Sequence, residues 1–231
     1  EQAVQPQGEL YMKDNYGWAL PLAAQKLGRK LFPYLMDQLR TAPLNEMHDP
    51  NSCPVHTAAD ALQCMVEPGD LPALREIMLC GDRWRASSAF FVLYGLDTDT
   101  RTDFLLDLYS APDASAIREQ VMKKMGYSAG VSALPRLLKL WEDGEILDKI
   151  QIAETIVAMW TPEYPHHTEE PDRLSDRERK EIDAGVRECV LATLRLDVSS
   201  LPSTEGRDVE LPMRNLAGAA SRLKTEEPPS S

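Results

Sequence analysis

An internal repeat with a period of 31 residues is the feature that most constrains the fold of this chain. Segments 82–95 and 113–126 align at this offset, and the same offset carries positions 118–125 onto 149–156. Apolar residues recur at helical spacing in each copy, so each copy is expected to be an amphipathic helix. The corresponding positions are Asp82 and Asp113; Ala86 and Ile117; Phe90-Phe91, Val121-Met122 and Ile152-Ala153; Tyr94, Met125 and Ile156; Gly95 and Gly126.

A second signature interleaves with the first: an apolar residue, then Pro, any residue, and Leu. It occurs at 32–35, 71–74 and 134–137, and the last two copies lie about two periods apart. Proline is tolerated in the first turn of a helix, because its missing N–H would have no intrahelical acceptor there. The repeating unit is therefore predicted to be a helix, a tight turn and a second helix.

Helical patterns cover most of the chain, and no segment reads convincingly as a strand. Asp70 and Asp113 are placed to cap the helices that follow them, and Ser175 forms a capping box with Glu178. Gly126 is expected to end a helix as its C-cap. We expect helices near residues 17–27, 31–41, 55–66, 71–80, 83–95, 101–110, 114–126, 131–142, 146–160, 176–196 and 208–223.

These patterns predict an all-α protein, an α-solenoid of stacked antiparallel helical hairpins. A single helical-repeat domain is expected over residues 11–223, with the clearest repeats at 69–160 and a Pro- and acid-rich loop at 161–175 that breaks them. Residues 1–10 read as a flexible leader and residues 224–231 as a disordered tail.

The stretch Asp70-Leu71-Pro72-Ala73-Leu74-Arg75, followed by Gly81-Asp82-Arg83-Trp84-Arg85, resembles the short, PBS-lyase-type HEAT-like repeats of bacterial proteins. The resemblance is best over residues 69–160. It implies an α-solenoid whose curved face binds other proteins, and it implies no general catalytic residues. Such a resemblance supports architecture more strongly than function.

The net charge of −12 constrains the partner. A nucleic-acid backbone or an anionic membrane surface would be repelled, since the sequence has no basic stripe to offset the field. No apolar run approaches the ~18 residues of a membrane span. A protein with a basic surface is the complementary partner, and solubility alone is the alternative explanation of the charge.

The polar segment that starts at Glu1 fits a mature N-terminus left by a secretory signal peptide. We therefore expect export, to a bacterial periplasm, with the cytoplasm as the alternative compartment. The four cysteines allow disulfides in such a compartment. Cys53 and Cys80 are expected to meet at one end of a helical hairpin and form a disulfide; the alternative is that all four cysteines are reduced. Cys189 falls on an apolar stripe and is expected to be a buried free thiol.

The run Gly126-Tyr127-Ser128-Ala129-Gly130 has the form of a hydrolase nucleophile elbow. That chemistry needs a strand that ends in a sharp turn, whereas an amphipathic helix precedes Ser128. We therefore expect no enzyme, and a hydrolase remains the alternative. Candidates for its acid and base are Asp143, Asp148, His166 and His167.

His48, Cys53, His56 and Cys64 lie near one another in the sequence, but their spacings match no compact zinc pattern. No metal or other cofactor is expected. The pair His166-His167 lies in the loop that breaks the repeat, where an insertion often carries recognition. A metal site or a pH switch at this pair and a plain solvated loop are the alternatives.

Trp84, Trp141 and Trp160 each sit near a helix end. Packing between hairpins is one explanation, and a binding hot spot is the other, because Trp buries a large area with few rotatable bonds.

We expect an interaction module that covers the working site of its partner, such as a bacterial immunity protein that inhibits a secreted toxin. The alternatives are a hydrolase or metalloenzyme that uses Ser128 or the histidines, and a non-inhibitory assembly scaffold. The helices at 71–80, 101–110 and 131–142 would line a concave face. The expected partner-binding residues are Arg75, Glu76, Asp103, Asp107, Arg136 and Glu142 on these helices, and Tyr164, His166, His167, Glu169 and Glu170 in the loop.

Overall fold

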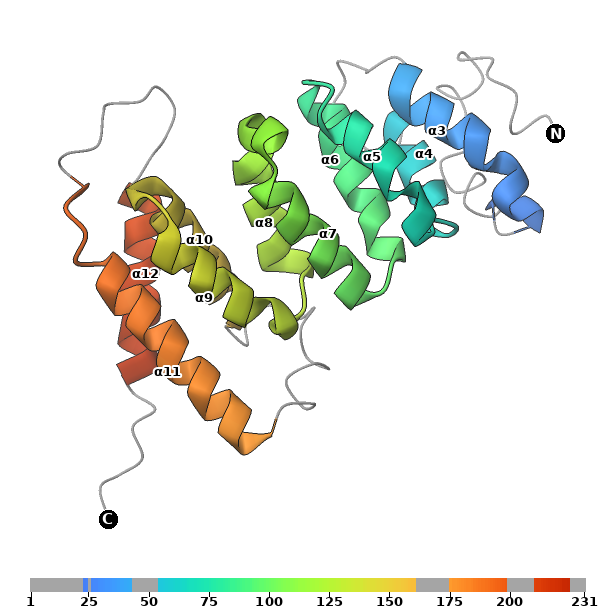
Figure 1. Ribbon diagram of the computed structural model, residues 1–231. Coiled ribbons are helices and arrows are strands. Elements are labelled where there is room, and N and C mark those ends of the chain that lie inside the picture. Colours follow the sequence, from blue (N-terminus) through green and yellow to red (C-terminus); the bar gives the residue numbers. More distant parts are fainter. Residues whose placement is uncertain (1–22, 25, 43–53, 161–174, 199–209, 225–231) are drawn as a thin grey trace. The chain divides into compact units, whose positions relative to one another are not determined.

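The computed structural model describes residues 23–24, 26–42, 54–160, 175–198 and 210–224 (Figure 1). Every regular element within these residues is a helix, and none is a strand. The all-α class is therefore confirmed for this part of the chain. In the same residues, no helix combines the length and the apolar character that crossing a membrane requires.

The helices lie close to their predicted positions, apart from the one expected at 17–27, which falls mostly outside the described residues. The elements are 3-10 helix η2 (Gly28–Leu31), α3 (Phe32–Thr41), α4 (Pro54–Gln63), η4 (Pro68–Asp70), α5 (Leu71–Met78), α6 (Arg83–Val92), η5 (Leu93–Gly95), α7 (Thr98–Ser110), η6 (Pro112–Ile117), α8 (Arg118–Ser128), η7 (Val131–Ala133), α9 (Leu134–Asp143), α10 (Ile146–Trp160), α11 (Asp176–Thr193) and α12 (Glu210–Lys224).

The chain divides into two compact units, with a boundary that passes through α7. Unit 1 comprises Glu1–Phe104 and Ala111–Ile117, and unit 2 comprises Leu105–Ser110 and Arg118–Ser231. The single repeat domain over residues 11–223 stays a prediction.

In unit 1, helix α4 is the centre of the packing: α3 and α6 both contact it, and α5 contacts α6. Val55, Ala58 and Leu62 of α4 are fully buried. The small alanine side chains on α4 allow its neighbours to approach closely. Helices α4 and α6, which are two apart in the sequence, are therefore side by side.

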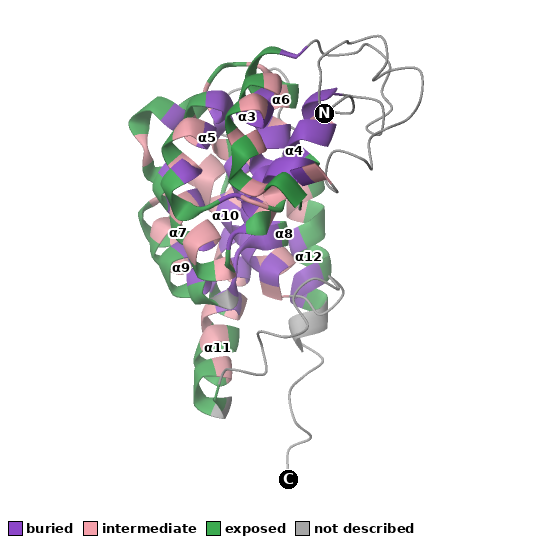
Figure 2. Ribbon diagram, turned by 90° about the vertical axis from the view of Figure 1, so that its right-hand side faces the viewer, coloured by how far each residue is buried: buried purple, intermediate pink, exposed green. Residues whose placement is uncertain are grey.

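In unit 2, helix α10 has the central position and contacts α8, α9, α11 and α12. A helix with four neighbours needs apolar residues on most of its surface, and the sequence of α10 supplies them at Ile150, Ile152, Ile156 and Met159, all buried. Helix α9 also contacts α11. Figure 2 shows buried residues grouped on α8 and α10, whereas the described side chains in the first half of α11 are exposed or half-buried.

The prediction that Gly126 ends a helix as its C-cap is wrong. It lies inside α8, which continues to Ser128, and so it is not a helix cap. A Cβ at position 126 would lie 3.2 Å from the Cβ of Ala158 in α10. Its counterpart one repeat earlier, Gly95, has an equivalent role in unit 1, because a Cβ there would collide with the carbonyl oxygen of Gln63. The repeated glycine therefore marks a close approach of backbones.

Two predicted caps have different outcomes. The capping box is confirmed: the Ser175 N–H donates to the Glu178 carboxylate at 2.9 Å, and the Ser175 hydroxyl oxygen accepts from the Glu178 N–H at 3.3 Å. Asp113 does not cap α8, because it lies within the 3-10 helix η6 and α8 begins only at Arg118.

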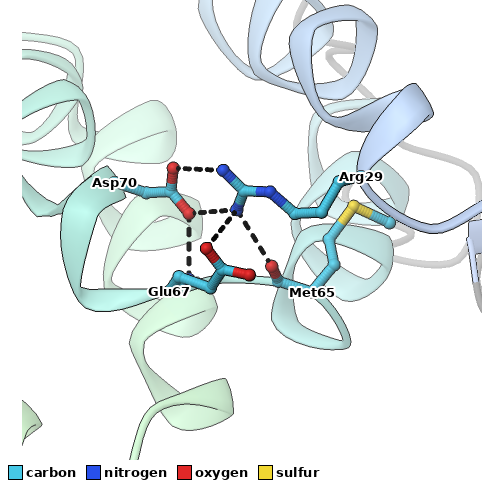
Figure 3. A network of polar contacts seen from close by, with 4 residues as sticks. All are labelled: Arg29, Met65, Glu67 and Asp70. Atoms are coloured by element: carbon cyan, nitrogen blue, oxygen red, sulfur yellow. Dashed lines mark hydrogen bonds and ion pairs between the residues drawn. The ribbon is translucent and has the colours of Figure 1, made fainter.

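The prediction that Asp70 caps the next helix is wrong, because no backbone N–H of α5 donates to its side chain. The carboxylate accepts instead from the Glu67 N–H at 2.9 Å and from the guanidinium group of Arg29 (Figure 3). Arg29 also donates to the carbonyl oxygen of Met65 at 3.2 Å, and its guanidinium lies 4.1 Å from the ring centroid of Phe32. These contacts join η2 to the turn between α4 and α5.

Candidate interaction surface

Three aromatic side chains form an exposed stripe along α6 and η5. Asp82 fixes the start of α6, since its carboxylate accepts from the N–H groups of Trp84 at 2.9 Å and Arg85 at 3.0 Å. Trp84 and Phe91 are seven residues apart, which is close to two helical turns, so they lie on one face. Trp84 is 53% exposed and Phe91 is 40% exposed. Tyr94 extends the stripe, because its ring centroid lies 5.6 Å from that of Phe91.

The end of the aromatic stripe is held by charged residues at the start of α7. The Arg101 guanidinium lies 5.4 Å from the Tyr94 ring centroid and donates to the Leu96 carbonyl oxygen at 3.2 Å. Asp97 accepts from the Thr100 N–H at 2.8 Å, and this hydrogen bond lowers the pKa of the Asp97 carboxyl. The Tyr94 end of the stripe therefore contacts the capped start of α7 and not an irregular loop.

The 31-residue repeat shows why this stripe is unusual. The positions of Phe91 and Tyr94 correspond to Met122 and Met125 in α8, which are 2% and 0% exposed. One period further on, Ala153 and Ile156 of α10 are buried as well. Where α8 and α10 bury aliphatic or methionine side chains, α6 and η5 present two aromatic rings that are partly exposed.

The three tryptophans that the sequence singles out have different surroundings. The Trp141 indole N–H donates to the Thr193 hydroxyl at 2.9 Å, and that of Trp160 donates to the Asp183 carboxylate at 2.6 Å. These two residues therefore join α9 and α10 to α11, as the packing explanation requires. Trp84, in contrast, presents more than half of its surface to solvent.

Four of the six charged residues predicted on the helices make ion pairs within their own unit. In unit 1, Glu76 pairs with Arg40 at 3.2 Å and Arg75 pairs with Asp113 at 2.5 Å. In unit 2, Asp107 pairs with Arg136 at 3.4 Å. The other two predicted residues on the helices, Asp103 and Glu142, are exposed. Tyr164, His166, His167, Glu169 and Glu170 lie outside the described residues.

A small pocket of about 180 Å³ lies at the end of the α5–α6 hairpin. Arg85 fixes one side of it by donating to the carbonyl oxygens of Leu39 at 3.0 Å and Ala42 at 2.6 Å, at the end of α3. The pocket is lined by Arg40, Glu76, Ile77, Cys80 and Arg85.

The predicted disulfide is not supported. Cys80 is an exposed free cysteine, as is Cys64, and Cys53 lies outside the described residues. Cys189 is a buried free cysteine, as predicted. Burial raises the pKa of its thiol to about 12. Little reactive thiolate is therefore present near neutral pH, as expected for a cysteine in the core.

Ser128 does not have the surroundings of a nucleophile elbow. It ends α8, it is 6% exposed, and its hydroxyl donates to the Lys124 carbonyl oxygen at 2.7 Å in the same helix. The residues that lead into Ser128 are helical and not a strand, since Ser128 is the last residue of α8. Asp148 accepts from the Tyr109 hydroxyl at 3.4 Å.

A different serine and histidine do lie together, in unit 1. The Ser88 hydroxyl on α6 and Nδ1 of His56 on α4 are 2.8 Å apart. Asp60 follows one turn after His56; desolvation raises the pKa of Asp60, and the charge of His56 opposes this shift. Ser88 is only 2% exposed, so a substrate carbonyl has no path to its hydroxyl. Sequence spacing gives no signal for this pair, because it depends on the packing of two helices.

Of the four residues weighed as metal ligands, the structure describes only His56 and Cys64. His48 and Cys53 lie outside the described residues, and His56 bonds to Ser88. Among the residues that the structure describes, no group of three or more His, Cys, Asp or Glu side chains could hold a metal ion.

Comparison of the chain with protein-family models, with curated proteins and with solved structures gives no match.

Proposed function

We propose that this chain is a HEAT-like α-solenoid that binds a partner protein and covers the partner's working site. The 31-residue repeat and the packing of alternate helices within each unit, α4 with α6 and α8 with α10, support a solenoid. Repeat arrays of this type present extended surfaces to macromolecules, because each hairpin contacts only its neighbours and leaves one flank uncovered.

The aromatic stripe of Trp84, Phe91 and Tyr94 is the observation that carries this proposal. Exposing the rings of Phe91 and Tyr94, at positions that two later repeats bury, has no benefit for folding. Tryptophan and tyrosine dominate binding hot spots, where truncation costs about 2 kcal/mol or more. The stripe would therefore provide most of the contact energy, with Trp84 as its anchor.

The acidic charge has a different role in this proposal. Glu76, Asp107 and Asp113 are already paired with arginines, so they are poor candidates for new direct contacts. A net charge of −12 still attracts a basic protein at long range. The charge would thus raise the association rate, and the aromatic stripe would slow dissociation.

The biological role that fits best is inhibition, with the chain as an exported bacterial immunity protein that neutralises a secreted toxin by occlusion. A non-inhibitory scaffold is the alternative within the same class. The two differ in stoichiometry and affinity: an inhibitor should form a tight one-to-one complex, whereas a scaffold should bind several partners weakly. Titration calorimetry with the captured partner separates them.

The decisive experiment compares two exposed aromatic residues. Wild-type, Trp84→Ala and Tyr127→Ala chains serve as bait for capture from the native organism, followed by mass spectrometry and affinity measurement on the purified partner. Tyr127 is 44% exposed on α8 and lies outside the aromatic stripe, so it is the matched control. We expect Trp84→Ala to weaken binding by about 30-fold or more, and Tyr127→Ala to leave it within about two-fold.

Two further readouts bear on the charge. Raising the salt concentration should lower the association rate much more than it raises the dissociation rate. A partner with an acidic binding surface, or an affinity that Trp84→Ala leaves unchanged, would overturn the proposal.

For the enzyme alternative, Ser128→Ala should leave the function intact; loss of a catalytic activity in a folded Ser128→Ala variant would favour a hydrolase instead.

A further inference from the structure

No further inference is drawn: the strongest candidate outside the aromatic stripe, the Ser88–His56 pair between α4 and α6, has a serine that is only 2% exposed and lies buried between the two helices, where no substrate can reach it.

Discussion

The guanidinium group of Arg29 meets the carboxylate of Asp70 edge to edge, with Nη1–Oδ2 at 2.5 Å and Nη2–Oδ1 at 3.0 Å, across 41 residues of sequence. Asp70 is nearly buried, and the Glu67 N–H donates a further hydrogen bond to its carboxylate. Since α3 directly follows the 3-10 helix that contains Arg29, this pair attaches the start of α3 to the α4–α5 turn. A bidentate charged pair of this kind fixes an orientation as well as a distance.

Asp70→Asn should lower the free energy of unfolding by about 1–3 kcal/mol, because Arg29 loses its charged acceptor while the site stays nearly buried. The matched control is Glu76→Gln, which breaks an ion pair whose carboxylate side chain is 75% exposed. That control should change stability by less than about 1 kcal/mol. Urea denaturation followed by circular dichroism measures both. Equal effects of the two substitutions would contradict the stabilising role of the pair.

The Arg29–Asp70 pair should also make stability depend on acid pH. Burial raises the pKa of Asp70, but the hydrogen bonds from Arg29 and the Glu67 N–H and the charge of Arg29 outweigh burial, so the pKa lies below its usual value. A carboxyl group of this kind stabilises the fold above its unfolded pKa of about 3.9 and ceases to do so as pH falls through the folded value. The advantage of wild type over Asp70→Asn in urea titrations should therefore disappear in strong acid. A constant advantage down to about pH 2 is the contrary result.

Gly126→Ala should destabilise unit 2 by about 1 kcal/mol or more, because the added Cβ would press on Ala158 at 3.2 Å and force α8 and α10 apart. This loss would occur although alanine is the better helix former by about 1 kcal/mol. Gly218→Ala in α12 is the control, since no atom lies within 4 Å of a Cβ there. It should stabilise by up to about 1 kcal/mol. Thermal unfolding of Gly126→Ala and Gly218→Ala measures both effects. A stabilising Gly126→Ala would show that α8 and α10 can move apart without cost.

Tyr109 should make stability fall at alkaline pH. Burial raises the pKa of Tyr109 to about 12; the charge of Asp148 adds to this shift, and that of Arg118 opposes it. A phenol with a raised folded pKa contributes fully below its unfolded value of about 10, and this contribution is lost as pH rises through about 12. Tyr109→Phe should therefore show a shallower loss of stability than wild type between about pH 10 and pH 12. Identical slopes for Tyr109→Phe and wild type would refute the prediction.

Cys189 should resist thiol reagents until the protein unfolds. Its sulfur is buried, and burial raises the pKa of the thiol to about 12, so the reactive thiolate is scarce near neutral pH. Two variants that each keep one cysteine, Cys189 or the exposed Cys64, allow a direct comparison. We expect the Cys64 variant to react at once with an aromatic disulfide reagent and the Cys189 variant to react at the rate of unfolding. Fast labelling of Cys189 in native buffer would mean that its helix opens locally.

Trp84, Trp141 and Trp160 show why the candidate site could be predicted only in part. All three sit near helix ends, and local sequence does not separate them. Trp141 and Trp160 find hydrogen-bond partners on α11, in residues that lie 52 and 23 positions further along the chain. Which tryptophan stays exposed is therefore decided by packing. Similarly, the charge pattern indicated Glu76 and Asp107 as contacts for a partner, but Arg40 and Arg136 already bind them.

The sequence by itself determined where the helices lie, because helix formation depends on interactions over a few residues. The apolar periodicity of α10 and the Ser175–Glu178 capping box act within one or two turns, and both were predictable. Tertiary structure decided what Asp70 and Gly126 do. The carboxylate of Asp70 binds Arg29 and the Glu67 N–H in place of the N–H groups of α5, and the missing side chain of Gly126 allows Ala158 to approach. The contacts with Arg29 and Ala158 depend on groups that are far apart in the sequence and that only folding brings together, so no local sequence pattern predicts them.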